Sequence, residues 1–212
     1  MILVGQYDSP FVRRVAVTLH AYSMAFTRNP LSVFGDFGPL QAINPLRRVP
    51  ALILDDGEAL IDSSAIIDWL DEKAGPRRSL IPREGLERRY ILQLVAMAHG
   101  TAEKVVTLSL ERFLNANKDR NKDWEARLAT QITSGLDALE ARATNRWLFG
   151  EHMSHADVMT GCMIGHLKLR VPELLTTECH PRLHELAARC ELNSHFVAAR
   201  IGANETMPAS AT

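Results

Sequence analysis

The chain has 212 residues, of which 46% are hydrophobic and 23% are charged. This length and apolar content suffice to bury the core of one large or two small domains. Its 24 basic and 25 acidic residues give a net charge of −1, which excludes the basic field that would attract nucleic acid.

The chain shows no export signal and no membrane span. Met1 leads directly into "ILVGQY", without a basic segment or a long apolar run before a cleavage site. No stretch of about 18 apolar residues occurs. The three cysteines, Cys162, Cys179 and Cys190, are odd in number and lack CxxC spacing, which suits a reducing compartment. We therefore expect a cytoplasmic protein without a membrane partner.

The pattern along the chain divides it into two domains. Residues 1–76 alternate strand-like and helix-like patterns, whereas the later part is one helical pattern after another. Between them, "AGPRRSLIPREG" places two prolines and two glycines around basic residues, as in a linker. We predict an α/β domain at 1–76, a linker at 77–85, an all-α domain at 86–201 and a flexible tail at 202–212.

The N-terminus reads as a strand followed by a helix. "MILVGQY" is a short apolar run, and Val12 and Val15 then fall on one helical stripe. Ser9 and Pro10 stand at the N-cap and first helical positions, which these residue types prefer. Capping alone explains a serine there, so any chemical role for its hydroxyl needs further evidence.

A hairpin and a second helix follow. The runs "VPALIL" and "EALI" are separated by Asp55-Asp56-Gly57, a strong hairpin signal. In "DSSAIIDWLDEKAG", Asp62 or Ser63 can cap a helix that Gly75-Pro76 ends.

The C-terminal part reads as consecutive helices. A long helix begins at Leu86, with Gly100 as a candidate kink, and another carries a stripe from Trp124 to Leu139. Ser154 and Asp157 then form a carboxylate variant of the capping box at the start of a third helix.

Three features of the α/β domain could together bind one peptide-like ligand. The Ser9 hydroxyl stands at a helix start. If the Val49-Pro50 bond is cis, Val49 can present its backbone to a bound peptide as an added strand. Asp62 and Ser63 can hold an α-ammonium and an α-carboxylate at a helix N-terminus. Ordinary capping and a plain strand entrance remain the alternatives at these positions.

The ordered set of motifs resembles the cytosolic glutathione S-transferase family. The resemblance rests on "SPFVRRVAVTLH", "NPLRRVPAL", the hairpin, "DSSAI" and "SHAD", and extends from Ile2 to about Arg200. It is nearest the bacterial branch around the omega and beta classes, with serine at the active-site position. It implies a thioredoxin-like N-terminal domain, an all-helical C-terminal domain, and glutathione as co-substrate.

The resemblance also implies residue roles. Ser9 would be the catalytic residue, with its hydroxyl facing the glutathione sulfur. Val49, before a cis Pro50, would pair with the cysteinyl part of glutathione. The remaining expected binding residues are Asp62 and Ser63 for the γ-glutamyl head, and Arg48 for the glycyl carboxylate.

Some positions depart from the family pattern or are ambiguous. No basic residue lies between Pro30 and Pro45, where omega-like members place a lysine for the glycyl end. Serine in place of cysteine at position 9 disfavours thiol-disulfide chemistry. Tyr7 is a second candidate hydroxyl, although a packed strand residue is the simpler interpretation. The arginine pairs, including Arg13-Arg14, are scattered, and we interpret them as solvated faces.

Two further groups of residues complete the sequence evidence. Met97, His99 and Thr101 lie on a helix that lines the second-substrate pocket in this family, although such residues are commonly core or surface. The pairs His152-x-x-His155 and His180-x-x-x-His184 lack the further ligands that structural zinc requires, so we expect no metal.

We therefore expect an enzyme, a homodimeric glutathione transferase of the detoxification type that acts on a small hydrophobic electrophile. Two alternatives remain. One is a non-catalytic binding or regulatory protein on the same fold, like the stringent-starvation regulators. The other is a glutathione-dependent isomerase or peroxidase.

Overall fold

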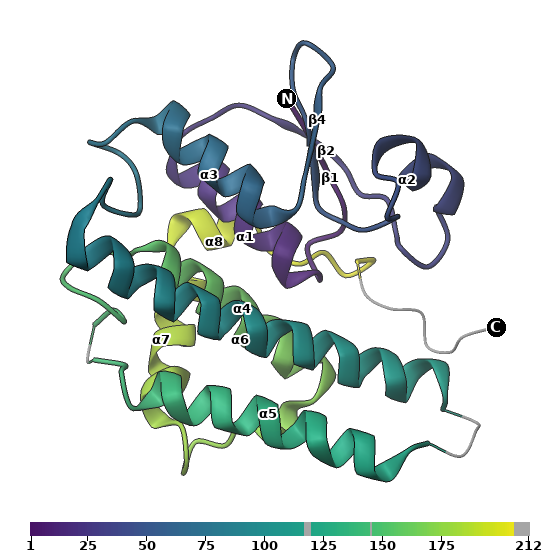
Figure 1. The fold of residues 1–212 in the computed structure, drawn as a ribbon, viewed down its shortest axis with the longest axis vertical. Coiled ribbons are helices and arrows are strands. Elements are labelled where there is room, and N and C mark those ends of the chain that lie inside the picture. Colours follow the sequence, from purple (N-terminus) through teal and green to yellow (C-terminus); the bar gives the residue numbers. More distant parts are fainter. Residues whose placement is uncertain (117–119, 145, 206–212) are drawn as a thin grey trace. The chain divides into compact units, whose positions relative to one another are not determined.

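The computed structural model describes residues 1–116, 120–144 and 146–205 (Figure 1). They form two compact units. The first contains Met1–Arg83 and the segment that begins at Leu192, and the second contains Glu84–Glu191. The boundary between Arg83 and Glu84 lies within residues 77–85, the expected linker. Residues 206–212 of the predicted tail lie outside the described residues.

The first unit is built on a four-stranded sheet in the order β2-β1-β3-β4. β1 (Ile2–Val4) pairs in parallel with β2 (Thr27–Asn29) and antiparallel with β3 (Ala51–Ile53). β3 pairs antiparallel with β4 (Ala59–Ile61), with Gly57 in the connecting turn at φ 91°. The predicted hairpin is therefore confirmed.

Helices cover both faces of this sheet (Figure 1). On one face, Leu40 of α2 (Phe37–Ile43) packs with Val4 and Ala51 in a buried cluster. Because strand residues alternate between faces, the fully buried Leu3 and Leu52 point the other way, toward α1 (Pro10–Ala21) and α3 (Ser63–Ala74). This arrangement brings the N-terminal ends of α1 and α3 to the sheet.

The C-terminal segment returns to the first unit. α8 (Ser194–Ala198) packs on α1, and the buried Arg13 donates from Nε to the Ala199 carbonyl at 3.0 Å. At the start of the segment expected to be a tail, Gly202 accepts a backbone hydrogen bond from Glu205 at 3.0 Å, and the Glu205 side chain is buried. The segment has no apolar stripe, and polar hydrogen bonds hold it instead.

The second unit consists of helices. Its main elements are α4 (Gly85–Leu114), α5 (Lys122–Glu140), α6 (His155–Arg170), the 3₁₀ turn η1 (Pro172–Leu174) and α7 (Pro181–Leu192). The capping box at the start of α6 is confirmed, with Asp157 accepting from the backbone and hydroxyl of Ser154 at 2.8 Å each. Among the described residues, no helix is both long enough and apolar enough to cross a bilayer.

A thioredoxin-like sheet domain followed by an all-helical domain is the architecture that the family resemblance implies. The α/β plus all-α fold class is therefore confirmed.

Candidate functional site

Ser9 forms the N-cap of α1. Its backbone is extended (φ −68°, ψ 122°), and its Oγ accepts a hydrogen bond from the Val12 N–H at 3.4 Å. This distance exceeds the usual range for N–H···O bonds, so the cap is weak. Because the hydroxyl acts here as an acceptor, the cap leaves its proton available for a ligand. Ser9 is half-buried.

Gly5 brings the start of α1 and the Val49 segment together. Its φ is +123°, and a Cβ at this position would lie 2.6 Å from Val12 Cγ2 and 2.9 Å from Val49 Cβ. Only glycine fits so close an approach in this backbone conformation. The end of β1, the first turn of α1 and Val49 therefore meet at one point.

The Val49-Pro50 peptide bond is cis, as the resemblance implies. The loop before it is held by the buried Asn44, whose Nδ2 donates to the Arg48 carbonyl at 2.8 Å while its Oδ1 accepts from the Leu46 N–H at 3.0 Å. The Arg48 side chain is exposed. Asn44 thus fixes the backbone that leads to Val49 and leaves the Arg48 guanidinium in solvent.

Asp62 adopts an unusual backbone conformation at the start of α3. Its φ of 68° and ψ of 128° place a non-glycine residue in a sparsely populated region, and its Oδ1 accepts from the Ser64 N–H at 2.7 Å. Such strain costs about 1–3 kcal/mol and clusters at ligand sites. Ser63, the first helical residue, is only 2% exposed.

A buried arginine connects α1 to this helix start. Arg14 is 2% exposed, and its Nη2 donates to Ser64 Oγ at 2.8 Å. Arg13 is equally buried, so interpreting this arginine pair as a solvated face was wrong. The sequence signal was misleading because the burial of each guanidinium depends on partners far along the chain, Ser64 and Ala199.

Tyr7 is packed inside the first unit. Its ring is 2% exposed and the Arg28 guanidinium lies over it, 3.5 Å from the ring centroid. Burial raises the pKa of the Tyr7 hydroxyl, and the nearby Arg28 only partly opposes this. These observations favour the packing interpretation over a second thiolate-stabilising hydroxyl.

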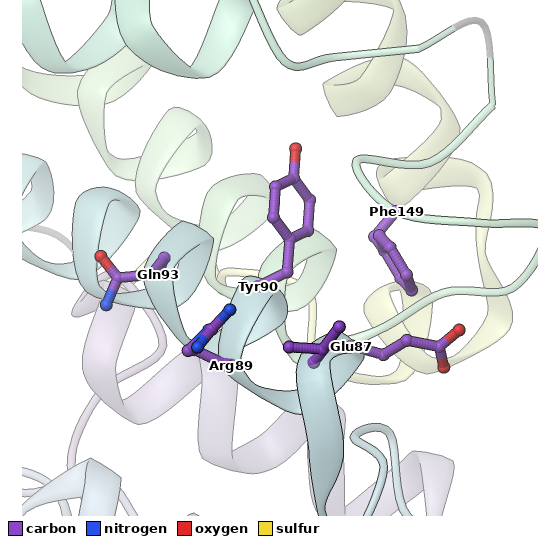
Figure 2. A pocket seen from close by; sticks show the side chains of 6 residues that line it. Glu87, Arg89, Tyr90, Gln93 and Phe149 are labelled. Atoms are coloured by element: carbon purple, nitrogen blue, oxygen red, sulfur yellow. The ribbon is translucent and has the colours of Figure 1, made fainter.

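The second unit contains a separate hollow of about 530 Å³ at the start of α4 (Figure 2). The Tyr90 and Phe149 rings stand together there, with centroids 5.4 Å apart and planes tilted by 49°. The full lining is Leu86, Glu87, Arg89, Tyr90, Gln93 and Phe149. None of the residues expected at the second-substrate pocket belongs to it.

Thr101, one of those expected residues, belongs to the core of the helical unit. It is 4% exposed, its hydroxyl donates to the Met97 carbonyl at 2.9 Å, and a Cβ on Gly135 would lie 2.1 Å from its Oγ1. Thr101 therefore serves the close packing of α4 against α5.

His180, from one of the two spaced histidine pairs, contacts a carboxylate rather than a cluster of metal ligands. His180 Nε2 lies 3.0 Å from Asp137 Oδ1 in a hydrogen bond between α5 and the start of α7. Across the described ranges, no group of three or more His, Cys, Asp or Glu side chains is placed to hold a metal ion.

Comparisons with known proteins identify the family. The glutathione S-transferase N-terminal domain family matches residues 3–78, and the C-terminal domain family matches residues 122–189. The chain is also 30% identical over 167 residues to the maleylacetoacetate isomerase of Pseudomonas aeruginosa, which covers 74% of this chain and 77% of that protein. The chain belongs to the glutathione S-transferase family.

Two further proteins are similar to this glutathione S-transferase family member over most of its length. The uncharacterized GST-like protein YibF of Escherichia coli is 29% identical over 171 residues, covering 80% of this chain and 83% of that protein. A glutathione transferase family member from Pseudomonas fluorescens Pf-5, solved with bound glutathione, is 30% identical with a TM-score of 0.82. That match covers 95% of this chain and 98% of the solved chain.

Proposed function

We propose that the protein binds glutathione on its first unit and that Ser9 stabilises the glutathione thiolate for attack on a small hydrophobic electrophile. The observation that supports this most directly is the close approach at Gly5, which joins the start of Ser9's helix to Val49. A glutathione-bound relative with 30% identity over nearly the whole chain adds to it.

Each part of glutathione has residues of suitable chemistry. The γ-glutamyl head would meet Asp62 and Ser63, where a helix N-terminus favours a carboxylate and Asp62 an ammonium group. The cysteinyl backbone would pair with Val49 beside Pro50, and the exposed Arg48 would meet the glycyl carboxylate. The strained backbone of Asp62 supports a ligand role, since capping alone does not require it.

The energies suffice for thiolate stabilisation. A thiol with a pKa of about 8.5 is roughly 3% ionised at pH 7, and lowering this pKa by about two units requires about 2.7 kcal/mol. A hydrogen bond from Ser9 to the charged sulfur contributes about 1.5–3 kcal/mol, and the N-terminus of α1 up to about 1 kcal/mol more. These two terms together match the requirement.

The reaction then needs little else from the protein. The thiol proton passes to solvent, and the sulfur lone pair attacks the electrophilic carbon while the leaving group departs with its bonding electrons. Throughout, Ser9 Oγ–H donates to the sulfur and Oγ accepts from the Val12 N–H, so the same hydroxyl caps the helix and stabilises the thiolate.

The test compares Ser9→Ala with Ser9→Thr at saturating glutathione, using an activated aryl halide as electrophile. Ser9→Ala should lower kcat about 10- to 100-fold and raise the pKa of the bound thiol, measured by ultraviolet thiolate absorbance. Ser9→Thr keeps the hydroxyl and the cap and should retain most of the activity. Unchanged turnover in Ser9→Ala would remove Ser9 from the mechanism.

A glutathione-dependent isomerase is the second candidate, because a relative at 30% identity is named a maleylacetoacetate isomerase. For an isomerisation of this kind we propose that the thiolate adds to a carbon–carbon double bond, the adduct rotates about the resulting single bond, and the thiolate leaves again. Glutathione is then required but not consumed. Measuring glutathione consumption with an electrophile and with a cis-unsaturated acid distinguishes the two reactions.

We further propose that the protein is a cytoplasmic homodimer. Light scattering at micromolar concentration tests the dimer. A calorimetric titration with glutathione separates both enzymatic proposals from a non-catalytic scaffold, since absence of binding at millimolar concentration would favour the scaffold.

A further inference from the structure

A buried carboxylate ties the C-terminal segment to the loop that precedes Ser9. The side chain of Glu205 is 11% exposed. Its Oε2 accepts from the backbone N–H groups of Tyr7 and Gly202, each at 3.3 Å, and its Oε1 pairs with Arg28 Nη2. The two backbone bonds are long, so the Arg28 ion pair is the main compensation for burying this carboxylate.

The loop from Gly5 to Ser9 has two kinds of backbone anchor. Gly5 N–H donates to the Asn29 carbonyl at 2.9 Å, which extends the pairing of β1 with β2, and Ser9 N–H donates within the loop to the Gln6 carbonyl at 3.2 Å. Tyr7 N–H, midway between them, donates instead to Glu205, 198 residues away in sequence.

Arg28 strengthens the same anchor from a third element. It projects from the edge strand β2, covers the Tyr7 ring at 3.5 Å, and pairs with the Glu205 carboxylate. Backbone and ring of Tyr7 are therefore held by one ion pair, two residues before the Ser9 hydroxyl.

We infer that Glu205 is a positioning residue, which fixes the Tyr7 backbone and through it the direction of the Ser9 hydroxyl. This inference rests on the proposed role of Ser9. Geometric precision is what a hydrogen bond to a thiolate requires, since a displacement of about 1 Å in an active site costs up to about 100-fold in rate. Glu205 lies outside the proposed glutathione-binding residues, so its loss should affect kcat more than the KM for glutathione.

The experiment compares Glu205→Ala, Glu205→Gln and the control Glu58→Ala, which removes an exposed glutamate of the same unit. Glu205→Ala should lower kcat about 10-fold with the glutathione KM changed less than about twofold, and should raise the pKa of the bound thiol. Glu205→Gln keeps an oxygen for the N–H groups but loses the charge that pairs with Arg28, so it should fall between wild type and Ala. The control should match wild type.

Backbone amide exchange supplies a readout independent of catalysis. The Tyr7 amide should exchange at least about 10-fold faster in the Glu205 variants than in wild type, while amides of α3 stay unchanged. If Glu205→Ala does not fold, the near-isosteric Glu205→Gln decides.

The outcomes separate this inference from the proposed function. A wild type that neither binds nor conjugates glutathione overturns the proposed function, and amide exchange then still tests the Glu205 anchor. An active wild type whose folded Glu205 variants keep the kcat and the thiol pKa overturns the positioning role. Unchanged Tyr7 exchange in those variants overturns the anchor itself.

Discussion

Replacing Gly5 with alanine should disturb both folding and glutathione binding. The added methyl group would lie 2.6 Å from Val12 Cγ2 and 2.9 Å from Val49 Cβ. Both distances are shorter than real Cβ atoms show to their neighbours. Either the first turn of α1 or the Val49 backbone must therefore move, and both belong to the proposed site.

The cost has two separable parts. The φ of +123° strains an alanine by about 1–3 kcal/mol, and forcing a methyl group into packed neighbours adds about 1–3 kcal/mol. Gly57→Ala is the matched control, because its φ of +91° imposes strain while no atom lies within 4 Å of its Cβ. The difference between the two variants isolates the steric part.

Urea unfolding and glutathione titration provide the measurements. With a slope of about 2 kcal/mol/M, the unfolding midpoint of Gly5→Ala should fall about 0.5–1.5 M below that of Gly57→Ala. The glutathione Kd should rise in Gly5→Ala and stay at the wild-type value in Gly57→Ala. Equal midpoints and equal Kd values in the two variants would refute the convergence of α1 and Val49 at Gly5.

Four other expectations follow from the hydrogen bonds and from burial. Arg14→Lys and Ser64→Ala should each weaken glutathione binding about 5- to 10-fold in calorimetric titration, because both loosen the start of α3. The double variant should bind glutathione no more weakly than either single variant. Additive losses would contradict the coupling of the two side chains. Asp157→Ala should lower the free energy of unfolding by about 2–4 kcal/mol in urea, since it removes a buried acceptor and the capping box; a loss below about 1 kcal/mol would count against this. Burial raises the pKa of the Asp157 carboxyl above its ordinary value of 3.8, although hydrogen bonds oppose the shift. The raised pKa therefore stabilises the fold most while the carboxyl is protonated, below about pH 4. This stabilisation is lost as pH rises through the folded-state pKa. The stability difference between wild type and Asp157→Asn should therefore shrink in urea titrations from about pH 3 to 7, and a widening difference would reverse the argument. Tyr22→Phe should cost about 1–3 kcal/mol in the same assay, because the buried hydroxyl donates to Asp71; a neutral substitution would show that this bond adds nothing.

The elements predicted well from sequence have local causes. Ser9-Pro10 specifies a helix start, Gly57 a hairpin turn, and Ser154 with Asp157 a capping box, each within a few residues of chain. The fold class follows from their order. In contrast, β2 has no apolar alternation, since Thr27–Asn29 is an edge strand that pairs through its backbone.

The supporting residues of the site depend on tertiary structure. Arg14, Gly5 and Glu205 act through Ser64, Val49 and Tyr7, which lie 44 to 198 residues away. A glycine at the end of an apolar strand does signal close backbone approach, so Gly5 could have been suspected. Nothing local marks a buried arginine or glutamate, because the partner that compensates its charge is distant in sequence.

The return of the C-terminal segment to the first unit affects the order in which the chain can fold during its synthesis. Ribosomes release the sheet and its helices long before α8, whose Phe196 is fully buried and lies against Arg13. The hydrogen bonds of Arg13 to Ala199 and of Tyr7 to Glu205 therefore cannot form until almost the whole chain has emerged. The first unit begins folding first but is completed last, so a nascent chain stalled in the helical unit would present an unfinished Ser9 loop to the cell.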